Sequence, residues 1–107
     1  MEHSNLCPKF EKAMEILSKR WTGLILFELL AGCKRFSDLE HALPISGRLL
    51  SERLKELEKE AIVQRIVYPE TPVRIEYVLT QKGKELQPFI QDIQQWASKW
   101  IKAEKMK

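Results

Sequence analysis

The stretch that decides the fold reads SGRLLSERLKELEKE and spans residues 46–60. Three of its leucines, Leu50, Leu54 and Leu57, recur at intervals of four and three, which places their side chains on one face of an α-helix. Ser46 is a favourable N-cap, because its hydroxyl can accept a hydrogen bond from a free N–H of the first turn. The stretch therefore predicts an amphipathic helix over 46–60, with a charged outer side.

A shorter helix is predicted immediately before this one. Ser37 and Glu40 have the spacing of a capping box, in which the serine caps the helix and the glutamate reaches back to the N-cap N–H. Leu43-Pro44 ends the helix, because proline cannot continue the hydrogen-bond ladder. Two short helices around a tight turn predict a helix-turn-helix over residues 37–60.

A β-hairpin is predicted after the helix-turn-helix, over residues 62–79. β-Branched and aromatic residues dominate 62–68 and 74–79, whereas 69–72 contains two prolines, which cannot donate to a β-ladder. Earlier in the chain, residues 34–36 are long enough only for a stub of strand. A hairpin after a helix-turn-helix is the winged variant of this motif.

Helices are also predicted at both ends of the chain. An apolar stripe begins after Pro8, a residue that suits the first helical position, and predicts an N-terminal helix over 8–20. Thr80 can cap a long C-terminal helix over 80–104, in which Pro88 should bend the first turns.

A single domain is expected over residues 1–107, mainly α with a small β-hairpin (α+β). Residues 24–30 are apolar on nearly every side, so they predict a buried central helix that Gly32 ends. Hydrophobic residues are 44% and charged residues 31% of the chain, an ordinary globular composition. The net charge of +3 permits nucleic-acid binding without arguing for it.

Several functional classes are disfavoured by what the sequence lacks. No apolar run is long enough to span a membrane, and the first residues do not resemble a signal peptide, so we expect a cytoplasmic protein without a membrane partner. The two cysteines are 26 positions apart and have no zinc-site spacing to either histidine, so neither a metal nor another cofactor is expected. Without a glycine-rich phosphate loop or a nucleophile beside a histidine, we expect no catalytic site.

The outer face of residues 46–60 has the side chains of a DNA reader. With the leucines inward, Arg48, Glu52 and Lys55 point outward, and Ser51 and Arg53 lie at the flanks. Arginine and lysine reach guanine edges or phosphates, serine can bond either, and glutamate accepts from cytosine. The predicted DNA contacts are Ser46, Arg48, Ser51, Glu52, Arg53 and Lys55 on the recognition helix, Lys34 and Arg35 at the strand stub, and Arg74 near the hairpin tip. The alternative is a solvated amphipathic helix whose glutamate pairs with its basic neighbours.

The last helix carries more apolar surface than one small core can bury. Phe89, Ile93, Trp96 and Trp100 recur at intervals of three and four, as in helices that pair along a stripe. The stripe either packs on its own domain or forms a two-fold dimer, which would match a palindromic operator in double-stranded DNA. We expect the dimer.

Cys7 occupies a chemically favourable place. Because it precedes Pro8, it should be the N-cap of the first helix or lie just outside it. A thiolate there faces the positive end of the helix dipole, with Lys9 and Lys12 nearby, and such settings enrich the nucleophilic form. The alternative is a surface cysteine of no consequence. Cys33, at the end of the apolar helix, is expected to be a small apolar filler.

The chain as a whole resembles the HxlR family of bacterial winged-helix regulators, and is most similar to its CatR/YodB branch of thiol-based repressors that respond to quinones and other electrophiles. The resemblance runs from Cys7 to about Trp100. It is carried by Cys7-Pro8, Lys19-Arg20-Trp21, Lys34-Arg35-Phe36, Leu50-x-x-Arg53-Leu54-Lys55-Glu56-Leu57, Pro69-x-x-Pro72 with Tyr77, Leu79-Thr80-x-x-Gly83, and Trp96-Ala97. Two positions depart from the family pattern: Glu60-Ala61 stands where an Asp-Gly pair is common, and Cys33 stands at a variable position.

The resemblance implies a winged helix-turn-helix with N- and C-terminal dimerisation helices, and redox sensing by Cys7. No second cysteine lies near Cys7 in sequence, so oxidised Cys7 would pair with Cys7 of a second subunit or with a low-molecular-weight thiol, or an electrophile would alkylate it. Two alternatives remain open: a protein-interaction module without DNA binding, and a DNA-binding repressor in which Cys7 senses nothing.

Overall fold

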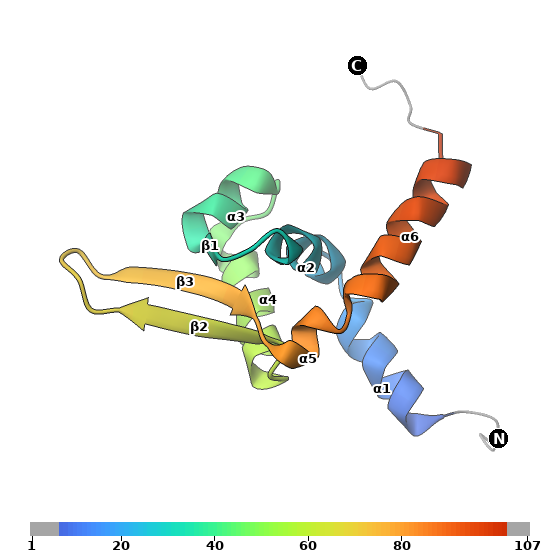
Figure 1. The fold of residues 1–107 in the computed structure, drawn as a ribbon, viewed down its shortest axis with the longest axis horizontal. Helices are drawn as coiled ribbons and strands as arrows, with labels where there is room; N and C mark the ends of the chain where they lie inside the picture. The colour runs from blue at the N-terminus through green and yellow to red at the C-terminus, as the bar shows by residue number, and fades with distance from the viewer. Residues whose placement is uncertain (1–6, 103–107) are drawn as a thin grey trace.

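The structure, a computed structural model, describes residues 7–102. Figure 1 shows a cluster of short helices with a long hairpin on one side and two projecting helices on the other. The elements follow in the order α1 (Pro8–Leu17), α2 (Thr22–Leu30), β1 (Lys34–Arg35), α3 (Phe36–Ala42), α4 (Gly47–Lys59), β2 (Val63–Tyr68), β3 (Arg74–Leu79), α5 (Gln81–Lys84) and α6 (Gln87–Trp100). The predicted winged helix-turn-helix is confirmed: α3 and α4 form the helix pair, and β2–β3 forms the wing.

The sheet has three antiparallel strands in the order β1-β3-β2. In β2 and β3, Val63 pairs with Leu79 at the base of the hairpin and Tyr68 pairs with Arg74 at its far end. The strand stub pairs with β3, so that the wing is joined to the start of α3. This pairing fixes the wing beside the helix-turn-helix.

The core lies between α2, α3, α4 and the base of the hairpin. Leu50, Leu54 and Leu57 of α4 are almost fully buried, as their spacing predicted. From the other elements the buried apolar residues are Ile25, Leu26, Leu29, Leu39, Leu43, Ile45, Ile62, Val63, Tyr77, Leu79 and Ile90. Burial of each large apolar side chain stabilises the fold by roughly 1.5–3 kcal/mol, so α4 is anchored along its inner face.

The start of α3 differs from the prediction. The helix begins at Phe36, and the Asp38 carboxylate accepts a hydrogen bond from the Arg35 N–H at 2.9 Å. Ser37 is therefore inside the first turn and is not the N-cap. The reason is tertiary: Arg35 pairs with Glu76 of β3, so the chain leaves the strand at Arg35 and enters the helix directly.

Both terminal helices also differ from the prediction: the N-terminal helix ends earlier, and the C-terminal helix is divided in two. α1 stops at Leu17, and the chain turns at Trp21, whose φ is 79°. The predicted C-terminal helix is two helices, because Pro88 has no N–H to donate to the carbonyl of residue 84 in a continuous helix. Thr80 caps only the short α5, where its Oγ1 accepts a hydrogen bond from the Gly83 N–H at 3.1 Å. The predicted helical residues 103–104 lie outside the described residues.

Candidate nucleic-acid interface

The recognition helix begins as the sequence predicted. Ser46 is the N-cap of α4, and its Oγ accepts a hydrogen bond from the Leu49 N–H at 3.1 Å. The other N–H groups of the first turn point along the helix axis, where a phosphate oxygen can accept from them. The start of α4 is therefore suited to a DNA backbone contact.

The outward face of α4 carries the predicted polar side chains. Arg48 has 91% of its side chain exposed, and its Nε lies 3.8 Å from Glu52 Oε2. Lys55 is exposed and Ser51 is half-buried. The pairing of Arg48 with Glu52 is long and solvated, so it contributes little to stability and can yield to a base or phosphate. The placement of these four residues is confirmed, and their contacts with DNA remain a prediction.

A groove separates α4 from the hairpin, and one basic side chain that lines it, Arg65, was not among the predicted DNA contacts. Ser51, Lys55 and Glu58 of α4 line it on one side, and Arg65 and Tyr77 of the hairpin line it on the other. Arg65 is exposed on β2 and pairs across the sheet with Tyr77. The signal in the sequence was the alternation of β2, since Arg65 lies two residues after the buried Val63 and so shares its face.

The strand stub divides its two basic residues between the faces of the sheet. Lys34 pairs with Tyr77 and Arg35 with Glu76, and directly paired residues point to the same face. Lys34 is therefore on the face of Arg65, next to α4, and Arg35 is on the opposite face. Only Lys34 of this predicted pair shares a face with the groove.

Arg74 is the first predicted contact that needs correction. Its guanidinium forms ion pairs with Glu70, at 2.9 Å, and with Glu76, and it stacks 3.9 Å from the centre of the Tyr68 ring. Hydrogen bonding from Arg74 lowers the pKa of Glu70, and hydrogen bonds to Glu70 and Glu76 raise the pKa of Arg74. The sequence predicted its place near the hairpin tip correctly, but two carboxylates neutralise its charge there.

Arg53 is the second predicted DNA contact that needs correction. Its side chain is only 16% exposed, its Nε donates to the Arg20 carbonyl at 2.9 Å, and its Nη1 lies 3.3 Å from Glu56 Oε2. The guanidinium thus faces the α1–α2 connection instead of the outer flank of α4. Helical spacing alone gave its direction roughly, and could not show a partner 33 residues away.

The two cysteines differ in their surroundings. Cys7 is exposed and is the N-cap of α1, as predicted, with its Sγ accepting a hydrogen bond from the Phe10 N–H at 3.4 Å. Cys33 is exposed as well, so its predicted role as a buried filler is wrong. The cause is the end of α2: after Leu30 the chain turns outward through Gly32, whose φ is 134°.

The apolar stripe of α6 does not pack on its own domain. Phe89 is 38% exposed, and exposure rises along the helix to 65% at Trp100. Ile90, beside the stripe, is the residue that α6 buries. Next to the stripe, Leu24 and Phe27 of α2 are also exposed, and an apolar groove runs between the two helices.

Two further observations concern residues 7–102. No group of three histidine, cysteine or acidic side chains is gathered there that could hold a metal ion. None of the helices in this part of the chain is both long and apolar enough to cross a membrane.

Comparison with known proteins places these features in a family. Residues 16–105 match the HxlR-like helix-turn-helix family. YvaP, an uncharacterized HTH-type transcriptional regulator of Bacillus subtilis, is 63% identical over 102 residues, which cover 94% of each chain. YodB, an HTH-type transcriptional regulator of Bacillus subtilis, is 49% identical over 98 residues, which cover 91% of this chain and 88% of YodB.

Solved structures agree with the sequence comparison. The reduced form of YodB matches with a TM-score of 0.80, covering 91% of this chain and 96% of that one at 49% identity. Its quinone-bound form matches with a TM-score of 0.77 at 45% identity over 89% of this chain and all of that one. The redox regulator HypR in its oxidised form has a TM-score of 0.85 at 32% identity, covering 91% of this chain and all of that one.

Proposed function

The chain belongs to the HxlR family of helix-turn-helix transcriptional regulators, and from that membership we propose that it is a dimeric repressor released from its operator by modification of Cys7. DNA binding and transcriptional regulation follow from the family itself. The sensing role is supported chiefly by one observation: Cys7 is an exposed thiol at the N-cap of α1, with a backbone N–H directed at its sulfur. The similar regulator YodB has reduced, diamide-treated and quinone-bound forms.

Two reactions are available to such a thiol. With a quinone, the Cys7 sulfur adds to a ring carbon, the thiol proton and the displaced ring proton move to the two oxygens, and a hydroquinone thioether remains. With an oxidant such as diamide, Cys7 and a second thiol together lose two protons and two electrons and form a disulfide. The N=N bond of diamide accepts the two protons and the two electrons and becomes an N–N single bond. The second thiol is Cys7 of the other subunit or a low-molecular-weight thiol.

The dimer is supported by the apolar surface that the monomer leaves exposed. Phe89, Ile93, Trp96 and Trp100 form one stripe on α6. Aromatic side chains each bury a large apolar area when they are covered, and monomeric proteins rarely expose a contiguous patch of this kind. A two-fold dimer through α6 covers the stripe and presents two copies of α4 to the half-sites of a palindrome.

The experiment that tests sensing compares two serine variants on DNA upstream of the chain's own gene. In a mobility-shift assay, the wild-type protein should release DNA after treatment with benzoquinone or diamide, and reductant should restore binding if a disulfide has formed. Cys33→Ser is the matched control, because Cys33 is also exposed and free, and it should respond like the wild type. A Cys7→Ser protein that releases DNA just as readily would refute sensing by Cys7 while leaving DNA binding intact.

A second experiment tests the DNA-reading face. Arg48→Ala and Lys55→Ala should each weaken operator binding, since both side chains are accessible on the outer side of α4. Binding should also weaken steeply with salt, because phosphate contacts release counterions. Unchanged affinity in both variants would show that the outer face of α4 does not read DNA, and a wild-type protein without salt-sensitive operator binding would favour a winged helix that binds a protein partner instead.

A further inference from the structure

The helix that carries Cys7 is lightly attached to the rest of the protein. None of the residues of α1 is buried, and it packs on the core through the half-buried Ile16 and Leu17, at its C-terminal end. The helix projects on the side of the molecule away from the hairpin (Figure 1). Ten helical residues rise about 15 Å, so Cys7 lies at the free N-terminal end of a short helix whose C-terminal end packs on the core.

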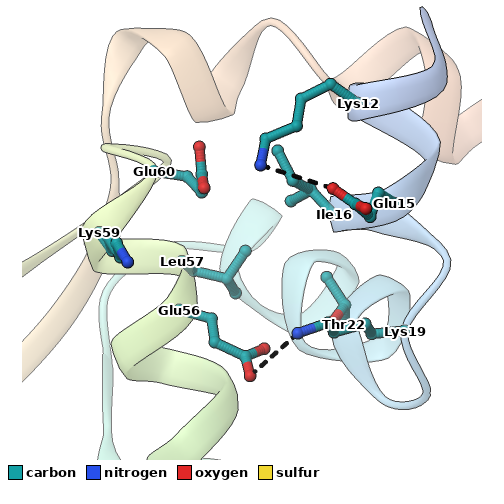
Figure 2. Close-up of a pocket in the computed structure, with 9 residues that line it drawn as sticks. All are labelled: Lys12, Glu15, Ile16, Lys19, Thr22, Glu56, Leu57, Lys59 and Glu60. Carbon is teal, nitrogen blue, oxygen red and sulfur yellow. Dashed lines mark hydrogen bonds and ion pairs between the residues drawn. The ribbon is translucent and has the colours of Figure 1, made fainter.

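The connection that follows the C-terminal end of α1 contacts the recognition helix through Glu56. Glu56 Oε2 lies 3.2 Å from Lys19 Nζ, in the connection between α1 and α2, and 3.3 Å from Arg53 Nη1. Figure 2 shows Lys19 and Glu56 linked beside the cavity between α1, α2 and α4. The Glu56 carboxylate therefore pairs both with Lys19 of the α1–α2 connection and with Arg53 of its own helix.

Arg53 makes the second link, and it is the better shielded of the two. Its Nε donates to the carbonyl of Arg20, the residue just before Trp21, where the chain turns from α1 into α2. Exposed ion pairs contribute little to stability, but a shielded guanidinium loses satisfied hydrogen bonds when its partners move. The position of the α1–α2 turn and the position of α4 are thus tied together by Arg53.

We propose that Arg53, Glu56 and Lys19, here called the α1–α4 latch, couple displacement of the Cys7-bearing helix to the position of the recognition helix. Arg53 is a positioning residue: it fixes α4 against the turn at which α1 ends. This inference rests on the proposed function, because it takes Cys7 as the modified residue. An adduct or a disulfide that shifts α1 then shifts α4 through the latch, with no contact between Cys7 and DNA.

The substitution that tests the latch is Glu56→Gln, and the structure offers a matched control in Glu15→Gln. Both glutamates line the same cavity and pair with a lysine (Figure 2). The partner of Glu15 is Lys12, on the same helix at 3.5 Å, so this pair does not join α1 to α4. Neither glutamate is among the predicted DNA contacts, and both variants lose one negative charge.

The measurement is the Kd for DNA upstream of the chain's own gene, by fluorescence anisotropy, before and after labelling with benzoquinone. Intact-mass spectrometry verifies that Cys7 is labelled equally in every protein. The ratio of labelled to unlabelled Kd should be the same in the wild type and in Glu15→Gln. In Glu56→Gln the unlabelled Kd should stay within about threefold of wild type, while the ratio falls about threefold, because the variant loses the ion pairs to Lys19 and Arg53 but keeps the bond from Arg53 to the Arg20 carbonyl.

Lys19→Met provides a second variant, because it removes the other partner of Glu56 and leaves α4 unaltered. It should lower the ratio in the same direction. Adding Arg53→Met to Lys19→Met also removes the bond to the Arg20 carbonyl, so the ratio in this double variant should fall about tenfold. A full wild-type ratio in the double variant, with equal labelling, overturns the latch and leaves sensing in place. A wild-type protein that keeps its DNA after complete labelling shows instead that the proposed sensing itself is wrong.

Discussion

At the scale of single residues, neighbouring carboxylates decide which cations are available to DNA. Arg74 and Arg65 lie on adjacent strands of the same wing, yet Arg74 is committed to Glu70 and Glu76 whereas Arg65 lines the groove beside Lys55. Formal charge in the sequence does not distinguish them. Their partners do, since a neutralised guanidinium has less attraction left for a phosphate.

We therefore predict that Arg65→Gln weakens operator binding and lowers the slope of log Kd against log salt by about one, because one phosphate contact is lost. Arg74→Gln is the control and should leave that slope nearly unchanged. Anisotropy titrations at several salt concentrations measure both. A greater loss of slope in Arg74→Gln than in Arg65→Gln would contradict the assignment.

Site residues could be predicted from the sequence where the periodicity of a single helix determines the direction of the side chain. Arg48, Ser51 and Lys55 are outward because Leu50 and Leu54 are inward, and that relation holds within α4 alone. Residues whose role depends on distant partners were beyond such reasoning. Arg53 bonds a carbonyl in another element, and the direction of Cys33 follows from the backbone at the end of α2.

At the scale of elements, the end of the recognition helix is held in an unusual way. The N–H of Ile62 donates to the Leu57 carbonyl and the N–H of Ala61 to the Glu58 carbonyl, both at 2.9 Å, which is the pattern of a Schellman motif. Its left-handed position, usually a glycine, is Ala61, with φ of 62°. The sequence comparison with the family pointed to this turn, and the structure shows its strain.

Ala61→Gly should stabilise the protein by roughly 0.5–1 kcal/mol, because relief of left-handed strain exceeds the added flexibility of the unfolded chain. Ala42→Gly, at the end of α3, is the control and should destabilise, since that alanine is helical. Urea unfolding followed by circular dichroism measures both. A loss of stability in Ala61→Gly would show that the turn is not strained by its side chain.

A second element-scale prediction concerns α5. A Cβ on Gly83 would clash with the carbonyl oxygen of Ile62 and lie 3.0 Å from Leu79 Cδ2, so this helix packs directly on the base of the hairpin. Gly83→Ala should cost about 2–3 kcal/mol of stability, as in other overpacked sites. Gly23→Ala, in α2 with open space around its Cβ position, should be neutral or stabilising in the same thermal melts. Equal melting temperatures for the two variants would count against this close packing.

The order of elements was predictable because caps, leucine spacing and the prolines of the hairpin loop act locally. Boundaries set by tertiary contacts were not. The pairing of Arg35 with Glu76 moves the start of α3, and Pro88 separates α5 from α6 after a pattern that otherwise reads as one continuous helix.

At the scale of the whole molecule, the proposed DNA-reading surface, formed by α4 and the wing, and the exposed apolar stripe of α6 lie on different sides. The hairpin extends from one side of the helical cluster and α6 projects from the other (Figure 1). A dimer through α6 therefore leaves α4 and the wing free in both subunits. Binding of the second half-site then becomes intramolecular, which raises the overall affinity without any new contact to DNA.

Ile93→Glu should accordingly convert the proposed dimer to a monomer and weaken binding to a palindromic operator by about 100-fold or more, because the gain from the second half-site is lost. The substitution lies on an exposed face, so the monomer should keep its melting temperature. Gln91→Glu is a control of the same charge on an exposed position of α6. Sedimentation velocity reports the oligomeric state, and anisotropy on full and half operators reports the affinity. An Ile93→Glu protein that sediments as the wild type would place the dimer contact elsewhere; a monomer that binds both operators equally well would show that symmetry contributes nothing to DNA recognition.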